Sequence, residues 1–128
     1  AVDERLRTAD PRIYAAGDVA RFPSPFDAEP IRIEHWVVAQ RQGRTAARNV
    51  LGMNEPFRSV PFFWSRQYDV SVCFVGHAGA RTERRVSGVV SAQDGRVDYV
   101  RNEEVVAVAT VGRDLESLEA EAALERRT

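Results

Sequence analysis

The sequence predicts an α+β fold, in which a shorter segment of one strand and one long helix precedes an antiparallel sheet with a covering helix. Three observations predict this class. Apolar residues recur at helical spacing between positions 34 and 51, short alternating stretches follow between 70 and 111, and a second helical pattern begins at Asp114. A linker at 53–60, which contains Pro56, separates the two parts. We therefore expect two domains, residues 1–55 and residues 56–128.

The composition is that of a globular protein without a strong charge bias. The chain has 128 residues, of which 44% are hydrophobic and 29% are charged, and its net charge is −1 at pH 7. This charge gives no electrostatic reason to expect binding to nucleic acid or to a membrane surface. Cys73 is the single cysteine and the chain has two histidines, so we expect no disulfide and no metal site. A cytoplasmic location is expected.

The first part of the chain is expected to centre on a short buried strand at residues 13–16 that ends in a Gly-Asp pair. Gly17 allows a ligand to approach the backbone closely, and Asp18 presents a carboxylate at the end of the strand. A carboxylate in this position suits the ribose-type hydroxyls of a nucleotide. An ordinary Gly-Asp turn is the alternative interpretation of the pair alone.

The long helix is expected from residue 34, with Gly52 as its stop. Its apolar and small residues follow helical spacing on one face, namely Trp36, Ala39, Gly43, Ala46, Ala47, Val50 and Leu51. Two interpretations of its start remain open. Either Trp36 is a core anchor, or the N-terminus of the helix directs backbone N–H groups at a ligand oxygen.

The second part of the chain is expected to form a sheet from strands at 70–75, 86–91, 97–101 and 105–111. Asp94-Gly95 is a strong hairpin signal, and Asn102-Glu103 predicts another tight turn. The strand at 105–111 is apolar on both faces, which predicts a central or covered position.

The last helix is expected to begin with Asp114 as its N-cap and to cover this sheet with Leu115, Leu118 and Ala122. The aromatic run at 61–64 is interpreted as packing at a core or domain seam. Cys73 is expected to be a small buried residue within the sheet rather than a nucleophile.

Three motifs together resemble a known family. The string at 8–18 reads T-x-D-P-x-I-Y-A-A-G-D, residues 33–36 read I-E-H-W, and residues 61–65 read P-F-F-W-S, followed by Q-Y at 67–68. In this order they resemble FAD-dependent pyridine-nucleotide oxidoreductases, in particular the ferredoxin reductases of oxygenase systems and the apoptosis-inducing-factor-like proteins. The resemblance covers nearly the whole chain, but it aligns with the C-terminal part of such an enzyme.

The resemblance implies the C-terminal part of a reductase that passes electrons from NAD(P)H through FAD to a ferredoxin-type or Rieske-type iron–sulfur protein. It implies that residues 1–55 are the C-terminal remnant of an FAD-binding domain and that residues 56–128 are the C-terminal reductase domain, which serves as an interface or dimerisation domain. It implies that Asp18 and Gly17 lie at the ribityl chain of the flavin, and that the start of the long helix lies at the pyrimidine edge. The cofactor-binding residues that it implies are Gly17, Asp18, Glu34, His35, Trp36 and Trp64. No catalytic side chain and no metal ligand is assigned.

The sequence lacks the G-x-G-x-x-G loop that holds a dinucleotide pyrophosphate at a helix N-terminus. We therefore expect that the nucleotide-binding portion lies upstream of this chain and that the chain alone is inactive. The alternative function is a non-catalytic interface or dimerisation module, with a homodimer as its assembly, that does not bind FAD on its own.

Overall fold

The computed structural model describes residues 1–27 and 29–127, and the chain divides into two compact units. Unit 1 comprises residues 1–59 and unit 2 comprises residues 60–128. The sequence pattern placed the domain boundary after residue 55. The assignment of the two units to a cofactor-binding remnant and an interface domain stays a prediction.

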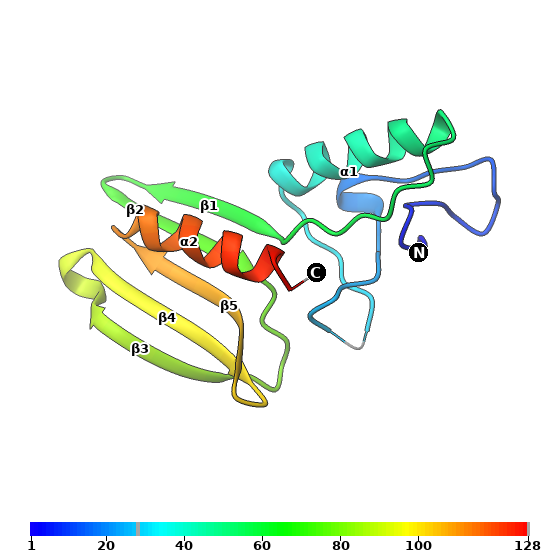
Figure 1. Cartoon of the computed structure of the whole chain (residues 1–128). Helices are drawn as coiled ribbons and strands as arrows, with labels where there is room; N and C mark the ends of the chain where they lie inside the picture. The colour runs from blue at the N-terminus through cyan, green and yellow to red at the C-terminus, as the bar shows by residue number, and fades with distance from the viewer. Residues whose placement is uncertain (28, 128) are drawn as a thin grey trace. The chain divides into compact units, whose positions relative to one another are not determined.

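Unit 1 contains little regular structure apart from helix α1 (Trp36–Val50) and the short 3₁₀ helix η1 (Gly17–Val19) (Figure 1). Isolated bridges join Arg7 to Tyr14 and Phe22 to Ile31. The rings of Phe22 and Phe57 meet edge to face, with centroids 5.4 Å apart. The apolar core of the unit consists of Leu6, Phe22, Ile31, Val38, Ala46 and Phe57.

The prediction of a buried strand at residues 13–16 is wrong. Ile13 is exposed, and Tyr14 forms a single bridge with Arg7 in place of a ladder. Ala15 donates its backbone N–H to the carbonyl of Leu6 at 3.0 Å. A strand requires a neighbour along its length, and the neighbouring segment that the structure describes here offers only this short contact.

Helix α1 begins two residues later than expected and ends as expected. His35 is its N-cap, and Gly52, at φ +88°, follows the last turn in the left-handed conformation that stops a helix. Of the face that follows helical spacing, Ala46 is buried but Trp36 and Val50 are exposed, so the interpretation of Trp36 as a core anchor is wrong. The buried residues of the helix are Val38, Gln42, Ala46 and Asn49, so two amide side chains help to define the inner face.

Unit 2 is a five-stranded antiparallel sheet with one helix against it, which confirms the predicted α+β class (Figure 1). The strands are β1 (Phe62–Gln67), β2 (Val70–Gly76), β3 (Glu83–Val89), β4 (Asp94–Arg101) and β5 (Glu104–Val111), in the spatial order β1-β2-β5-β4-β3. Strand β5 is central, as predicted, and Val106, Ala107 and Val108 within it are buried.

Two details of the sheet differ from the sequence pattern. The aromatic run belongs to edge strand β1, which a two-residue turn joins to β2, with Gln67 opposite Val70. The turn between β3 and β4 lies at the 3₁₀ helix η2 (Val90–Ala92), not at Asp94-Gly95. Gly95 is instead paired with Gly88, and a Cβ at Gly95 would lie 2.7 Å from Cγ2 of Val90. This glycine therefore permits close packing of the turn onto β4.

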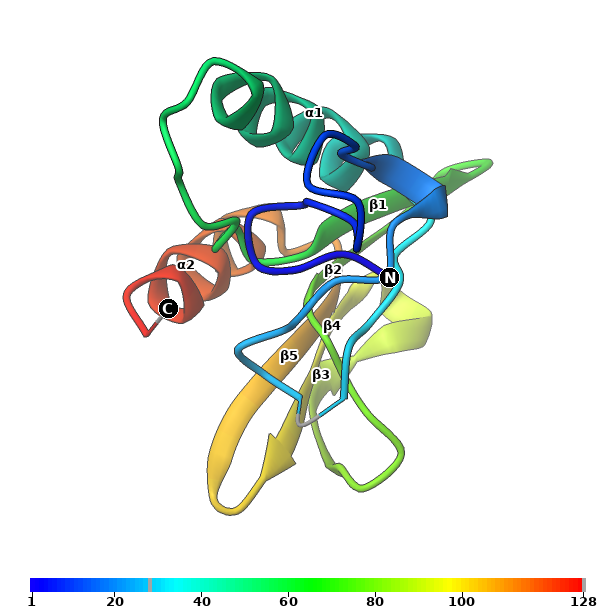
Figure 2. The same cartoon turned by 90° about the vertical axis from the view of Figure 1, so that its right-hand side faces the viewer.

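Helix α2 (Asp114–Glu125) lies against β2 and β5 on one face of the sheet (Figures 1 and 2). Its N-cap is Arg113, so Asp114 is the first helical residue and not the cap. The predicted packing stripe is also wrong, because Leu115 and Leu118 are exposed. The buried residues are Ser117, Ala120 and Leu124, and the two small ones let the helix approach the strands closely. No described helix is long and apolar enough to cross a membrane.

Candidate functional site

The Gly-Asp pair lies in the short helix η1, directly beside helix α1. Gly17 has φ +79°, and a Cβ there would lie 3.3 Å from Cβ of Ala39, so the backbone turns tightly against the helix. Its N–H donates to Oε1 of Gln42 at 2.7 Å. Asp18 follows with an exposed side chain. The structure therefore presents the Asp18 carboxylate to solvent from a turn that α1 supports.

Arg32 connects Asp18 to the segment that leads into α1, and sequence analysis did not identify it. Its Nη1 donates to the carbonyl oxygen of Asp18 at 3.5 Å, while its Nη2 lies 2.5 Å from Oε1 of Glu34. Arg32 lies between the buried bridge residue Ile31 and the partly buried Ile33. This alternation of apolar and charged residues in an extended segment was the signal that could have placed the Arg32 side chain on the outer face. A single guanidinium thus contacts both the backbone carbonyl of Asp18 and the carboxylate of Glu34.

The N-terminus of α1 completes one edge of unit 1. This edge consists of Asp18, Arg32, Glu34, His35 and Trp36. Nδ1 of His35 accepts a hydrogen bond from the backbone N–H of Val37 at 3.4 Å, which caps the helix. The rings of His35 and Trp36 have centroids 6.0 Å apart, and 59% of Trp36 is exposed. Helix N-termini carry partial positive charge and unpaired N–H groups. The end of α1 can therefore receive a ligand oxygen, with an aromatic surface beside it.

Five of the six predicted site residues therefore lie together in unit 1. Gly17 and Asp18 are held against α1 and Arg32, and Glu34, His35 and Trp36 form the entry of that helix. Hydroxyl groups of a ligand can donate to the carboxylate of Asp18, while ligand carbonyl oxygens suit the helix N-terminus. Their role in binding a cofactor stays a prediction.

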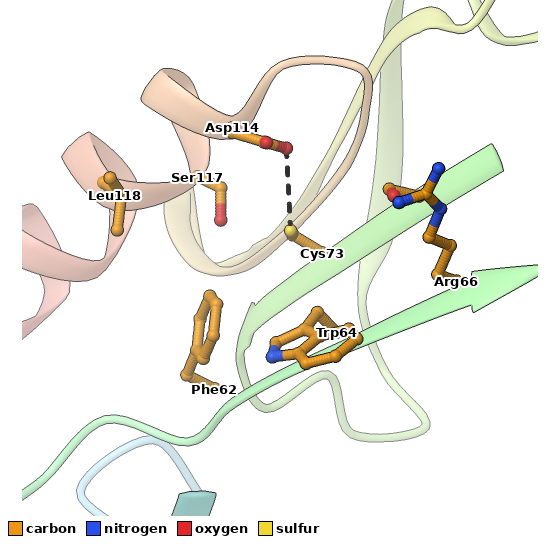
Figure 3. A pocket seen from close by; sticks show the side chains of 8 residues that line it. Phe62, Trp64, Arg66, Cys73, Asp114, Ser117 and Leu118 are labelled. Atoms are coloured by element: carbon orange, nitrogen blue, oxygen red, sulfur yellow. Dashed lines mark hydrogen bonds between the residues drawn. The ribbon is translucent and has the colours of Figure 1, made fainter. Parts of the chain in front are cut away.

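Trp64, the sixth residue, lies in unit 2 and lines a pocket between the sheet and α2 (Figure 3). The pocket has a volume of about 350 Å³. It is lined by Phe62, Trp64, Arg66, Ser71, Cys73, Asp114, Ser117 and Leu118. Trp64 is 48% exposed, so its indole is available to a ligand or to another part of the protein. Its place beside the other five residues stays a prediction.

Cys73 lines this pocket and is only partly buried, so its interpretation as a buried packing residue is wrong. Its Sγ donates to Oδ1 of Asp114 at 3.9 Å (Figure 3). Burial raises the pKa of the thiol above its ordinary value; the contact with Ser117 lowers it, and the negative charge of Asp114 raises it. The group is therefore a protonated thiol at neutral pH.

Within residues 1–27 and 29–127, no cluster of His, Cys, Asp and Glu side chains could hold a metal ion.

Comparisons with known proteins match both parts of the chain. The family model described as "Reductase C-terminal" matches residues 62–128, and the model described as "Pyridine nucleotide-disulphide oxidoreductase" matches residues 1–43. Because the first model spans more than half of the sequence, the chain belongs to the reductase C-terminal family. The resemblance predicted from the three motifs is confirmed.

Individual relatives agree with this family. The chain is 39% identical over 113 residues to the 5,5'-dehydrodivanillate O-demethylase ferredoxin reductase subunit of Sphingobium sp., covering 88% of this chain and 27% of that protein. It is 40% identical over 87 residues to the anthranilate 1,2-dioxygenase system ferredoxin–NAD(+) reductase component of Burkholderia cepacia, covering 68% of this chain and 21% of that protein.

A solved structure supports the same fold. The match is to the covalent putidaredoxin reductase–putidaredoxin complex, with a TM-score of 0.90 and 32% identity, over 98% of this chain and 30% of that one. The chain thus spans about a quarter of the length of the curated relatives that it matches.

Proposed function

We propose that this chain is the C-terminal part of an NAD(P)H-dependent flavoprotein reductase that passes electrons through FAD to a ferredoxin-type acceptor. The observation that supports this proposal most is the edge of unit 1. There, Arg32 contacts both Asp18 and Glu34, which leads into the N-terminus of α1. The matches to ferredoxin reductase components over most of the chain support the same function.

The residues of this edge fit a flavin. FAD offers ribityl hydroxyls, which can donate to a carboxylate, and a pyrimidine ring, whose oxygens can accept from a helix N-terminus. Gly17 is buried, and the place of its missing Cβ faces Ala39, so this glycine lets the turn that carries Asp18 pack tightly against α1. The exposed indole of Trp36 supplies an apolar surface beside these polar groups.

The chemistry of the reaction belongs to the cofactor, which accepts a hydride and releases electrons singly when it is bound. The residues of this chain bind and orient it. Asp18 accepts hydrogen bonds from ligand hydroxyls, and the entry of α1 at Glu34, His35 and Trp36 holds the pyrimidine edge. Trp64 is a further residue that we propose to contact the flavin ring.

The electron acceptor in this proposal is an iron–sulfur protein of the ferredoxin or Rieske type. The relatives are ferredoxin reductase components, and one similar structure is a complex of putidaredoxin reductase with putidaredoxin. We further propose that the protein acts in the cytoplasm and that it can assemble as a homodimer. Analytical ultracentrifugation of the full-length protein tests this assembly.

The test uses the full-length protein that contains this chain. The purified protein is expected to carry FAD with its visible absorption bands, to oxidise NADH or NADPH, and to reduce an added [2Fe–2S] ferredoxin. A protein that binds no FAD after reconstitution would refute the proposal. FAD binding without reduction of any iron–sulfur protein would refute the proposed acceptor class.

The isolated 128-residue chain tests the alternative, a non-catalytic interface module. The chain has no G-x-G-x-x-G loop to hold the pyrophosphate of the cofactor, so we expect it to bind free FAD poorly. In gel filtration of the chain mixed with FAD, a flavin that co-elutes with the protein would contradict this expectation. Separate elution would agree with this expectation and would leave the proposed role of the full-length protein untouched.

A further inference from the structure

Gln42 lies in the middle of α1 and is completely buried, although its side chain is polar. Its Oε1 accepts the hydrogen bond from the backbone N–H of Gly17 at 2.7 Å, across 25 residues of sequence. Because an N–H group can only donate, this contact fixes the orientation of the amide. The Gln42 side chain therefore connects the helix to the turn that carries Asp18.

The turn at Gly17 depends on this support from α1. Gly17 has a left-handed φ of +79°, and its carbonyl accepts from the N–H of Ala20 at 2.8 Å. Its own N–H points to the side chain of Gln42 instead of to a neighbouring strand. Ala39, one turn before Gln42, packs directly against the same glycine. The position of Asp18 is thus determined by the helix and not by a sheet.

The remaining polar atom of Gln42 indicates that the amide does more than fill space. Its Nε2 is buried and has no hydrogen-bond partner among the residues that the structure describes. A buried donor without a partner is costly, and an apolar side chain of similar size would avoid that cost. The contact with Gly17 is the interaction that explains an amide at this position.

We infer that Gln42 is a positioning residue for the cofactor: it holds the Gly17 turn against α1 and so fixes Asp18 relative to the helix N-terminus. This inference rests on the proposed function, because it assumes that these two groups bind the same ligand. Gln42 itself does not touch the ligand, since its side chain is wholly buried. Its effect passes through the backbone of Gly17.

The test compares three variants of the full-length protein by FAD affinity and by the visible circular dichroism of the bound flavin. Gln42→Met has a similar length but cannot accept the Gly17 N–H, whereas Gln42→Glu retains an oxygen that can. Gln40→Met is the matched control, because Gln40 is exposed on the same helix. The urea midpoint of each apoprotein is measured as well, to separate folding from cofactor binding.

We expect Gln42→Met to weaken FAD binding by about tenfold and to change the flavin dichroism, because Asp18 is displaced. Gln42→Glu and Gln40→Met are expected to stay within about threefold of the unmodified protein, since one hydrogen bond is kept and the other site is exposed. If Gln42→Met does not fold, the Glu variant still tests the inference by retaining affinity and spectrum.

Two results would overturn the inference while leaving the proposed function intact. In the first, the unmodified protein binds FAD, and a folded Gln42→Met variant has the same FAD affinity and the same flavin spectrum. The other is equal weakening in the Met and Glu variants, which would show that the acceptor oxygen is not what matters. Failure of the unmodified protein to bind FAD at all would overturn both.

Discussion

Unit 1 and unit 2 are of similar length, but different kinds of hydrogen bond hold them together. In unit 2, ladders of backbone hydrogen bonds join five antiparallel strands, and helix α2 covers part of one face. In unit 1, buried amide side chains bind the backbone of distant segments. Nδ2 of Asn49 donates to the carbonyls of Arg5 and Glu55 at 2.9 and 2.8 Å, and Oδ1 accepts from the N–H of Glu55.

This difference has a consequence for function. A sheet distributes its stability over many equivalent backbone bonds, whereas in unit 1 the side chains of Gln42 and Asn49 also join segments that are distant in the sequence. The residues of the proposed cofactor edge, Asp18 and His35, lie in the unit with fewer regular bonds. Their geometry therefore depends on single side chains that can be removed one at a time.

The two tryptophans allow the units to be followed separately. Trp36 lies in unit 1 and Trp64 in unit 2, and the chain contains no other tryptophan. A Trp36→Phe background makes fluorescence report on unit 2, and a Trp64→Phe background makes it report on unit 1. The next two predictions are measured by urea unfolding in these backgrounds.

The largest effect is expected from Gly76→Ala at the end of β2. Gly76 has φ +83°, and a Cβ there would lie 2.3 Å from the carbonyl oxygen of Val106 in the neighbouring strand. The clash with rigid backbone and the strained φ are expected to cost unit 2 about 3 kcal/mol or more. The measurement is the urea midpoint reported by Trp64.

Gly43→Ala in α1 is the matched control for this substitution. Gly43 is inside a helix, and among the described residues no atom beyond its chain neighbours and the backbone of that helix lies within 4 Å of a Cβ built there. Alanine there is expected to stabilise unit 1 by about 0.5–1 kcal/mol through its higher helix propensity. Loss of stability at Gly43, or none at Gly76, would contradict the geometry of these positions.

Asn49→Leu is expected to be the next largest effect and to be confined to unit 1. The leucine removes three hydrogen bonds to Arg5 and Glu55 and leaves partly buried backbone groups unpaired, which costs about 3 kcal/mol. The measurement is the urea midpoint reported by Trp36. Arg48→Leu is the control, because Arg48 forms only an exposed ion pair with Glu55 and should change stability by less than about 0.5 kcal/mol. Equal losses for the two variants would show that Asn49 does not organise the unit.

A smaller effect is expected at the pocket of unit 2, where Asp114→Asn removes a negative charge beside Cys73. Burial is the main reason that the pKa of the thiol lies above its ordinary value, and the charge of Asp114 raises it further. The thiolate is therefore scarce below the raised pKa, and alkylation accelerates as the pH rises through it. The variant should shift this profile to lower pH, so its iodoacetamide rate at pH 8 should rise about threefold.

The measurement uses the 128-residue chain, in which Cys73 is the single cysteine, so alkylation reports on this site alone. Glu119→Gln is the control, because Glu119 is an exposed acid on the same helix and does not line the pocket. An unchanged pH profile in Asp114→Asn, or an equal shift in both variants, would mean that Asp114 does not influence the thiol.

The two units also differ in how much of their structure the sequence could predict. Local signals were sufficient where local chemistry decides the structure: Gly52 ends α1, Asn102 and Glu103 both have positive φ in the turn between β4 and β5, and the apolar β5 is central. The resemblance in three motifs led to the correct family.

Positions decided by tertiary packing could not be predicted in the same way. The exposed faces of the helices are the clearest case, because Ser117 and Ala120 are buried in α2 for their small size while Leu115 and Leu118 face outward. Gln42 is buried for its hydrogen bond to Gly17. A pattern of hydrophobicity ranks such residues as surface positions.

The most direct test of the account is the FAD affinity of the full-length protein with Asp18→Asn. The exposed acid Glu29, also in unit 1, provides the control Glu29→Gln. If Asp18 and the start of α1 bind one cofactor, the Asp18 variant should bind FAD about tenfold to a hundredfold more weakly, with the control unchanged. Wild-type affinity in a folded Asp18→Asn protein would contradict the claim that this edge of unit 1 holds the flavin.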